Sequence, residues 1–158
     1  MDLQPFVTII MPIRNEGGFI ARSLGAVLGQ DYPADRIEVL VADGLSTDST
    51  RAVVADLALA HPNVRLLDNP GQIVSTGLNR ALPLARGDVI IRVDGHCEIA
   101  PDYVRRCVAH LRADGVDGVG GPIETVADTP AGATIALAMG SPFGVGGSAF
   151  RTVRDRAL

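Results

Sequence analysis

Short runs of apolar, mostly β-branched residues alternate with amphipathic segments over residues 7–123 of the chain. The runs predict strands at residues 7–11, 37–42, 64–67, 89–93 and 116–123. Between them, apolar residues recur at helical spacing and predict helices over residues 15–28, 48–60, 73–85 and 101–111. This β-α-β-α-β-α-β-α-β order is typical of an α/β fold, a parallel, doubly wound sheet with helices on both faces.

Two of the predicted strands end in the same way. Residues 37–44 read IEVLVADG and residues 89–96 read VIIRVDGH, so an aspartate and a glycine close each run. Strands buried on both faces read as continuous apolar runs, and open α/β sheets bind ligands at the carboxyl ends of their strands. We therefore expect the carboxylates of Asp43 and Asp94 to face one crevice.

Composition narrows the classes of function. The chain has 158 residues, enough for one domain with a core, and 47% of them are hydrophobic, which excludes a disordered chain. The net charge is −4 and aromatic residues make up 4% of the chain. Nucleic acid is therefore not an expected partner, because its binding requires basic surfaces and often stacked aromatic rings.

The expected compartment is the cytoplasm. Cys97 and Cys107 are the two cysteines of the chain and predict small, reduced side chains rather than a disulfide framework. No signal-peptide pattern opens the sequence. The apolar stretch 131–149 is interrupted by Pro142 and five glycines and does not predict a membrane span.

Dinucleotide binding shares this layout and requires a GxGxxG turn after the first strand. That turn reads PIRNEGG over residues 12–18, so the fingerprint is absent, and the chain has no GxxxxGK[ST] loop. The turn also lacks the Gly-rich, basic character expected of a nucleotidyltransferase. The sequence therefore disfavours both classes.

Motifs at the ends of three predicted strands occur together and in order. They are Pro-x-Arg-Asn-Glu at 12–16, VLVADGLSTDST at 39–50 and Asp-Gly-His at 94–96, with QDYP at 30–33 between the first two. Over residues 3–121 the chain resembles the donor-binding half of family 2 glycosyltransferases of the GT-A fold. Residues 92–101 and 120–125, together with residues 141–151, are most similar to glucosyltransferases of succinoglycan-type exopolysaccharide synthesis.

This resemblance implies a fold and a division of the chain. The fold is a Rossmann-like nucleotide-diphospho-sugar transferase, with a mostly parallel sheet flanked by helices and truncated relative to the family. Residues 1–125 would form the nucleotide-sugar-binding α/β domain. Residues 126–158 would begin the acceptor-side region, which is incomplete.

The resemblance also assigns roles to residues. Pro12, Arg14 and Glu16 would line the nucleotide pocket, and Asp43 would accept a hydrogen bond from the uracil ring. Asp94, Gly95 and His96 stand in the place of the family's metal-binding DxD motif, so Asp94 and His96 would hold a divalent cation, Mn²⁺ or Mg²⁺. The implied nucleotide-sugar-binding residues are Pro12, Arg14, Glu16, Asp43, Asp94 and Gly95.

Several residues of these motifs can equally serve ordinary structural roles. Glu16 and Asp48 can act as carboxylates at helix starts, where the helix dipole favours negative charge. His96 can contact a phosphate instead of a metal, or be an ordinary loop histidine. Glu98 can supply the carboxylate that His96 replaces. Near the turn before the third helix the family usually carries a lysine, where this chain has Gln72.

The implied activity is inverting, metal-assisted transfer of a sugar, glucose by the finer resemblance, from a UDP-sugar to a lipid-linked or polysaccharide acceptor. Such a reaction needs a general base for the acceptor hydroxyl, which the family carries in a second half. Glu124 and Asp128 are the carboxylates that follow the fifth predicted strand, and neither lies in a matching motif. No catalytic residue is assigned, and we expect residues 1–158 to bind the donor but to transfer poorly.

Three further expectations concern membrane association, self-association and an alternative function. A complete parent protein would work at the cytoplasmic face of a membrane, as longer members of the family do. An exposed sheet edge or apolar patch would favour self-association. The alternative from a different class is a non-catalytic nucleotide-binding or interaction module with the same fold.

Overall fold

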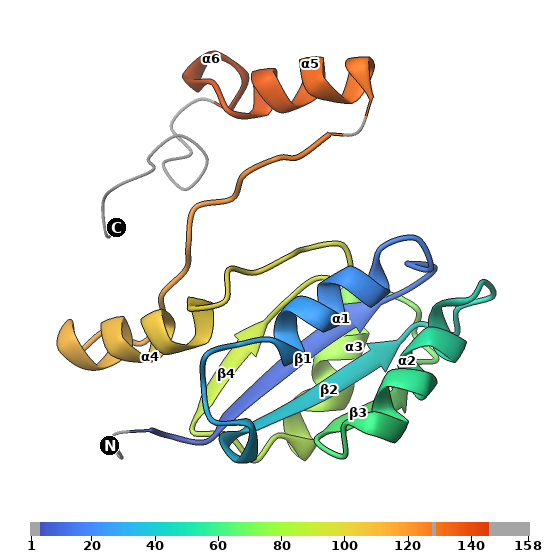
Figure 1. Cartoon of the computed structure of the whole chain (residues 1–158), viewed down its shortest axis with the longest axis vertical. Coiled ribbons are helices and arrows are strands. Elements are labelled where there is room, and N and C mark those ends of the chain that lie inside the picture. Colours follow the sequence, from blue (N-terminus) through green and yellow to red (C-terminus); the bar gives the residue numbers. More distant parts are fainter. Residues whose placement is uncertain (1–3, 128, 146–158) are drawn as a thin grey trace. The chain divides into compact units, whose positions relative to one another are not determined.

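The structure is a computed structural model and describes residues 4–127 and 129–145. Its strands are β1 (Val7–Ile13), β2 (Ile37–Asp43), β3 (Val64–Asp68) and β4 (Val89–Arg92). Its helices are α1 (Ile20–Leu28), α2 (Thr50–Ala60), α3 (Val74–Ala81), α4 (Tyr103–Ala113), α5 (Pro130–Met139) and α6 (Pro142–Val145). Two short 3₁₀ helices, η1 (Ala34–Arg36) and η2 (Leu82–Leu84), complete the described elements (Figure 1).

The four strands form one sheet in the order β3-β2-β1-β4, and every neighbouring pair is parallel. All residues of β1 and β2 are buried, which explains why these runs are mostly apolar rather than alternating; Thr8, Glu38 and Asp43 are their buried polar residues. The predicted α/β fold with a parallel sheet is confirmed. Because the strands are parallel, their carboxyl ends meet at one edge of the sheet.

The first strand does not stop before Pro12, as the sequence predicted, but continues to Ile13. The Ile10 carbonyl accepts from the N–H of Val93 at 3.1 Å, and the Ile13 carbonyl accepts from the N–H of Gly44 at 2.8 Å. Backbone groups alternate between the two sides of a strand, so those of Pro12 face the β4 side, beyond the last residue of β4. The absence of an N–H on Pro12 therefore removes no hydrogen bond from the sheet.

Helices cover both faces of the sheet (Figure 1). On one face, α1, α2 and α4 pack on β1, β2 and β4. The core residues of this face include Ile9, Met11, Val39, Val41, Ile91, Ile20, Leu24, Val54, Val104 and Val108. On the other face, α3 packs on Ile10 and Leu40 through Ala81 and Leu78.

The predicted fifth strand is wrong: residues 116–123 have no regular secondary structure. Val116, Val119 and Ile123 are 42%, 37% and 50% exposed. A strand needs a partner, and the described strands pair only with one another; the glycines at 118, 120 and 121 further weaken the segment. The chain divides into two compact units between Gly115 and Val116. The domain boundary expected at residue 125 stays a prediction.

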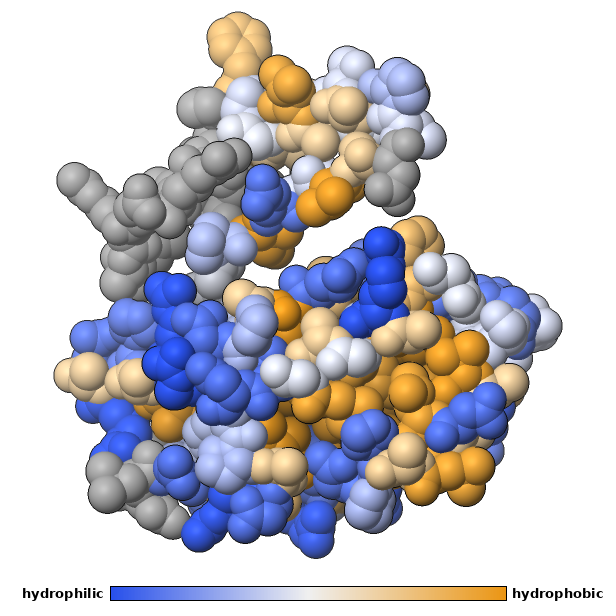
Figure 2. Space-filling model, in the orientation of Figure 1, coloured by the Kyte–Doolittle hydropathy of each residue, from blue (hydrophilic) through white to orange (hydrophobic). Residues whose placement is uncertain are grey.

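Helix α2 carries an exposed apolar surface. Its sequence, TRAVVADLALA, holds two charged residues, Arg51 and Asp56, and its Leu59 is 88% exposed. Figure 2 shows the resulting apolar area over this helix. None of the described helices is both long enough and apolar enough to cross a bilayer.

Candidate functional site

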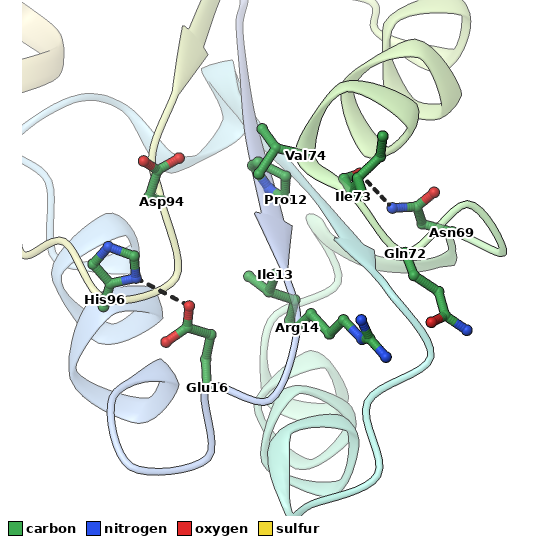
Figure 3. A pocket seen from close by; sticks show the side chains of 10 residues that line it. All are labelled: Pro12, Ile13, Arg14, Glu16, Asn69, Gln72, Ile73, Val74, Asp94 and His96. Atoms are coloured by element: carbon green, nitrogen blue, oxygen red, sulfur yellow. Dashed lines mark hydrogen bonds and ion pairs between the residues drawn. The ribbon is translucent and has the colours of Figure 1, made fainter.

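A hollow of about 360 Å³ opens at the carboxyl ends of β1 and β4, with the loop between β3 and α3 on its opposite side (Figure 3). It is lined by Pro12, Ile13, Arg14, Glu16, Asn69, Gln72, Ile73, Val74, Asp94 and His96. This volume lies in the range of small-molecule sites, about 300–1,000 Å³. Five of the predicted site residues, Pro12, Arg14, Glu16, Asp94 and His96, are therefore brought together, whereas Asp43 and Gly95 do not line the hollow.

The loop after β1 is held against the loop after β2. The N–H of Asn15 donates to Ser46 Oγ at 2.8 Å, and Asn15 Oδ1 accepts from the N–H of Thr47 at 2.9 Å. Asn15 has a φ of 54°, in the left-handed region that asparagine adopts more readily than most residues. These contacts fix the backbone next to Arg14.

Asp48 and Thr50 hold the following residues of the same loop. The N–H of Glu16 donates to Thr50 Oγ1 at 2.8 Å, and the N–H of Gly17 donates to Asp48 Oδ2 at 3.0 Å. Asp48 Oδ1 also accepts from the N–H of Thr50 at 3.0 Å, just before α2 begins. Hydrogen bonds from the Thr50 side chain and backbone, and then from Gly17, lower the pKa of Asp48. The helix-start role of Asp48 thus matches its contacts, which also position Glu16.

Asp43 is fully buried at the end of β2. Its carboxylate accepts from the N–H of Ser46 at 3.0 Å, from the Ser46 hydroxyl and from Arg51 at 2.6 Å. Arg51 also donates to Asp68 at 2.8 Å, and these bonds raise its pKa further. In this structure Asp43 joins the ends of β2 and β3; its contact with a uracil ring stays a prediction.

A tight turn over residues 94–97 follows β4. The N–H of Cys97 donates to the carbonyl of Asp94 at 3.0 Å. The hydroxyl of Ser23, a buried residue of α1, donates to the carbonyls of both Asp94 (3.2 Å) and Cys97 (2.8 Å). The turn is therefore attached to α1 at both of its ends.

At Gly95 this turn passes close to the side chains of Ile13 and Glu16. A Cβ atom at this position would lie 2.8 Å from Ile13 Cγ2 and 2.9 Å from Glu16 Cγ. These distances are shorter than van der Waals contact, so only glycine fits without a shift of its neighbours. The role predicted for Gly95 in nucleotide-sugar binding stays a prediction.

Charged side chains are paired across the hollow. Arg92 donates to both oxygens of Asp94, at 2.8 and 3.2 Å, and Asp94 is 33% exposed. Nδ1 of His96 lies 3.0 Å from Glu16 Oε1 (Figure 3). The backbone carbonyl of Glu16, not its carboxylate, accepts hydrogen bonds from the N–H groups of Phe19 and Ile20 at the start of α1. The side chain of Glu16 thus belongs to the hollow rather than to the helix start.

Asp94 and His96, the two predicted metal ligands, lie together, and Cys97 joins them. One ligand atom from each of Asp94, His96 and Cys97 lies within 4.8 Å of the others. Glu98, the alternative carboxylate, instead pairs with Arg22 at 3.4 Å. Burial, and then the charge of Asp94, raise the pKa of the Cys97 thiol. The sequence predicted Cys97 to be a small core side chain, and the residue does pack against the hydrophobic core; the sequence did not predict that its sulfur also lies near Asp94 and His96.

Sequence reasoning also assigned no role in the site to Asn69, Ile73 and Val74, which line the side of the hollow opposite Asp94. The buried Asn69 amide donates to the carbonyl of Ile73 at 3.0 Å and so shapes this loop. The rule that ligands bind at the carboxyl ends of parallel strands, applied to β3, would have found them. Gln72, at the place of the family's lysine, also lines the hollow, with a φ of 59°.

The two carboxylates considered as bases belong to the later part of the chain. Glu124 is exposed in the segment after α4, within the second compact unit. Asp128 lies outside the described residues.

The profile of the family described as "Glycosyl transferase family 2" matches residues 8–149. The chain belongs to glycosyl transferase family 2. Membership confirms the resemblance drawn from the motifs, and with it the assignment to a family of sugar-transferring enzymes.

Two relatives of the chain support this family membership. It is 36% identical over 146 residues to the succinoglycan biosynthesis protein ExoA of Rhizobium meliloti, covering 91% of this chain and 44% of that protein. It is 34% identical over 121 residues to the glycosyltransferase AglE of Haloferax volcanii, covering 76% of this chain and 40% of that protein. The chain thus spans less than half the length of these relatives.

A solved structure has the same fold. The mannosyltransferase PcManGT of Pyrobaculum calidifontis, in complex with GDP-Man and Mn²⁺, matches with a TM-score of 0.67 and 31% identity. The match covers 77% of this chain and 36% of that one. The GT-A fold expected from the family is confirmed.

Proposed function

We propose that the chain binds a nucleotide-sugar donor, a UDP-sugar of the glucose type, for inverting transfer to a lipid-linked or saccharide acceptor. One observation carries the proposal. Five residues to which the family motifs assign the donor or its metal, Pro12, Arg14, Glu16, Asp94 and His96, line a single hollow in a family 2 chain.

The walls of the hollow offer apolar and polar groups to the nucleoside of such a donor. Pro12, Ile73 and Val74 supply apolar surface for a flat base and ribose. Asn69, Gln72 and Arg14 supply polar groups on the same side (Figure 3). For Asp43 we keep the proposed contact with the base; because Asp43 is fully buried in this structure, this contact requires that the loop after β2 open to admit the base.

The charges near β4 favour a divalent cation beside the diphosphate. Arg14 and Arg92 balance Glu16 and Asp94, so the hollow and its immediate neighbours carry no excess positive charge of their own. When bound, a divalent cation neutralises the diphosphate and stabilises its charge as it leaves. Asp94 oxygen and His96 nitrogen fit Mn²⁺, while Mg²⁺ prefers an all-oxygen set.

A second donor class has a specific observation in its favour. PcManGT, described with GDP-Man, is the 31% identical solved structure. A guanine donor is therefore the alternative to a uracil donor, and the base is the part of the proposal that needs a direct comparison.

We keep the expectation that residues 1–158 bind the donor more readily than they transfer its sugar. Both carboxylates that line the hollow are already paired, Glu16 with His96 and Asp94 with Arg92. Neither stands ready to take a proton from an acceptor hydroxyl. Action of the parent protein at the cytoplasmic face of a membrane remains part of the proposal, as does self-association through β4, which is an edge strand of the described sheet.

The test is calorimetric titration of the chain with UDP, UDP-glucose and GDP-mannose, with and without Mn²⁺. We expect Mn²⁺-dependent UDP binding that weakens about tenfold or more in Asp94→Asn, at least the loss that follows from removing a hydrogen-bond partner of a metal ligand. Asp88→Asn, an exposed aspartate before the other end of β4, is the matched control and should bind normally. Tighter binding of GDP-mannose would favour the alternative donor, and no nucleotide binding at all would overturn the proposal.

A further inference from the structure

Three different metal-binding groups project from the single turn after β4. They are a carboxylate oxygen of Asp94, an imidazole nitrogen of His96 and the sulfur of Cys97, all within 4.8 Å of one another. Among the described residues this is the one group of at least three potential ligands that lie so close. The family motif accounts for the place of the first two residues and leaves the sulfur unexplained.

Side chains of α1 and of Gln30, just after it, hold the backbone of this turn and of the segment that follows it. Ser23 Oγ donates to the carbonyls of Asp94 and Cys97 from α1. Farther along, Gln30 Nε2 donates to the carbonyl of Ala100 at 2.8 Å, and Gln30 Oε1 accepts from the N–H of Val104 at 2.9 Å. A fixed backbone lowers the ordering cost of bringing three ligands to one ion.

His96 is oriented by Glu16. Its Nδ1 lies 3.0 Å from Glu16 Oε1, so Nε2, the opposite ring nitrogen, takes no part in that bond (Figure 3). Metal-binding histidines usually ligate through one ring nitrogen and donate through the other to a carboxylate, a backbone carbonyl or water. Glu16 is only 19% exposed, which strengthens its hold on the ring.

We propose that Cys97 completes, with Asp94 and His96, a three-ligand site that prefers a borderline cation such as Zn²⁺ or Co²⁺ over Mg²⁺. Thiolate and imidazole ligands select these metals, whereas Mg²⁺ requires oxygens in octahedral geometry. Ligand atoms on a tetrahedral zinc ion lie about 3.3–3.8 Å apart, so modest side-chain rotations close the set. The Cys97 thiol gives its proton to solvent as the sulfur binds.

Two neighbouring groups bear on this site. Arg92 pairs with Asp94, but both side chains are partly exposed, and a carboxylate has acceptor positions for a cation and a guanidinium together. The fourth position of a tetrahedral ion is left to water or to a diphosphate oxygen. The diphosphate as fourth ligand rests on the proposed function, whereas the three protein ligands do not.

Cobalt tests the sulfur directly, because a thiolate bound to Co²⁺ gives a charge-transfer absorption in the near ultraviolet. The metal-free, reduced chain is titrated with Co²⁺ in the absence of nucleotide. We expect this absorption in the wild type and in Cys107→Ser, a matched control in which the buried cysteine of α4 is changed. We expect Cys97→Ser to lose the absorption and to bind Co²⁺ about tenfold more weakly.

Competition then tests the preference: Zn²⁺ at equimolar concentration should remove the cobalt absorption, and Mg²⁺ in large excess should not. A wild type without the charge-transfer absorption, or a Cys97→Ser variant that keeps it, overturns the proposal. So does removal by Mg²⁺. If the chain binds nucleotide but gives no cobalt absorption, only this inference is overturned. If it gives the cobalt absorption but binds no nucleotide, only the proposed function is overturned.

If the Cys97→Ser variant fails to fold, a measurement on the wild type alone still tests the proposal. Cys97 is partly exposed and Cys107 is buried, so alkylation followed by mass spectrometry distinguishes the two thiols. Zn²⁺ should protect Cys97 from alkylation, and Mg²⁺ should not. Equal alkylation of Cys97 with and without Zn²⁺ would contradict the site.

Discussion

The two strand-end aspartates have nearly the same local sequence and opposite surroundings. Asp43 is fully buried, and its carboxylate is bound by Ser46 and Arg51. Asp94 is 33% exposed and pairs with the exposed Arg92. The sheet order explains the difference, because β2 lies between β1 and β3 whereas β4 is an edge strand of the described sheet.

A strand-end Asp-Gly motif therefore marks a position in the fold rather than a role. At the centre of the sheet the carboxylate is enclosed by neighbouring loops and joins strands together. At the edge it keeps an open side toward the hollow, where a ligand or ion can reach it. The structure separates a carboxylate that holds the site from one that is placed to bind.

The largest expected effect is the difference in stability between Asp43→Ala and Asp94→Ala. Removing the buried carboxylate leaves Arg51 and the Ser46 N–H without their partner, and we expect a loss of about 3 kcal/mol in the free energy of unfolding. The exposed pair of Asp94 and Arg92 should contribute less than about 1 kcal/mol. Urea unfolding of both variants measures the difference.

A matched change refines this result. Asp43→Asn keeps the shape and one acceptor oxygen but removes the charge, so its stability should fall between those of the wild type and Asp43→Ala. If Asp94→Ala proved as destabilising as Asp43→Ala, the contrast between the two strand ends would fail.

Glu38 gives the comparison a third carboxylate, near the amino end of the sheet. It is 1% exposed and accepts from Thr8 at 2.7 Å and from the backbone and side chain of Arg86 at 2.7 and 2.8 Å. Burial alone would raise its pKa, but these hydrogen bonds and the Arg86 charge outweigh it and lower the pKa. Glu38 thus resembles Asp43 in burial and in the number of its partners.

The sign of the pH effect follows from this lowered pKa. The unfolded chain binds the proton first, so the stability from Glu38 is present above the unfolded pKa, about 4.3, and is lost as pH falls through the folded pKa. Glu38→Gln should cost about 2 kcal/mol at pH 7, the scale of hydrogen bonds to a charged group. The free energy of unfolding of Glu38→Gln should also decrease less steeply than that of the wild type as pH falls from about 5 to about 3. Urea unfolding over this range checks both, and parallel curves would contradict the assignment.

The sheet was predictable from its apolar, β-branched runs, and residues 37–42 lie, as expected, in a strand that is buried on both faces. The same expectation for residues 89–93 is wrong, because β4 is an edge strand of the described sheet and its Ile90 is 43% exposed. The run 116–123 has a similar composition but no partner strand among the described residues, and pairing is not written in a local pattern. The extension of β1 through Pro12 was missed for a related reason. It depends on where β4 ends.

The site was predictable as far as strand ends and family motifs reach. Glu16, Asp94 and His96 lie together as expected, because the carboxyl ends of parallel strands share one edge. The full burial of Asp43 was not predicted, because it depends on the sheet order and on loop contacts such as those with Ser46 and Arg51. Cys97 was missed because a cysteine next to an apolar segment is usually a core residue.

The glycines of the two motifs give the smallest expected effect. An alanine Cβ at 95 would lie 2.8 Å from Ile13 and 2.9 Å from Glu16, whereas at 44 its nearest atoms would lie at 3.2 Å. Gly95→Ala must shift Ile13, Glu16 or the turn itself and so disturb the bond between Glu16 and His96. We therefore expect about tenfold weaker Co²⁺ and UDP binding, with stability reduced by about 1 kcal/mol. Gly44→Ala should weaken binding less, and Gly18→Ala, whose Cβ meets nothing within 4 Å, should leave it unchanged. Equal affinities in Gly95→Ala and Gly18→Ala would mean that the approach of the two loops does not position the site, and that the edge strand alone exposes Asp94 to its ligand.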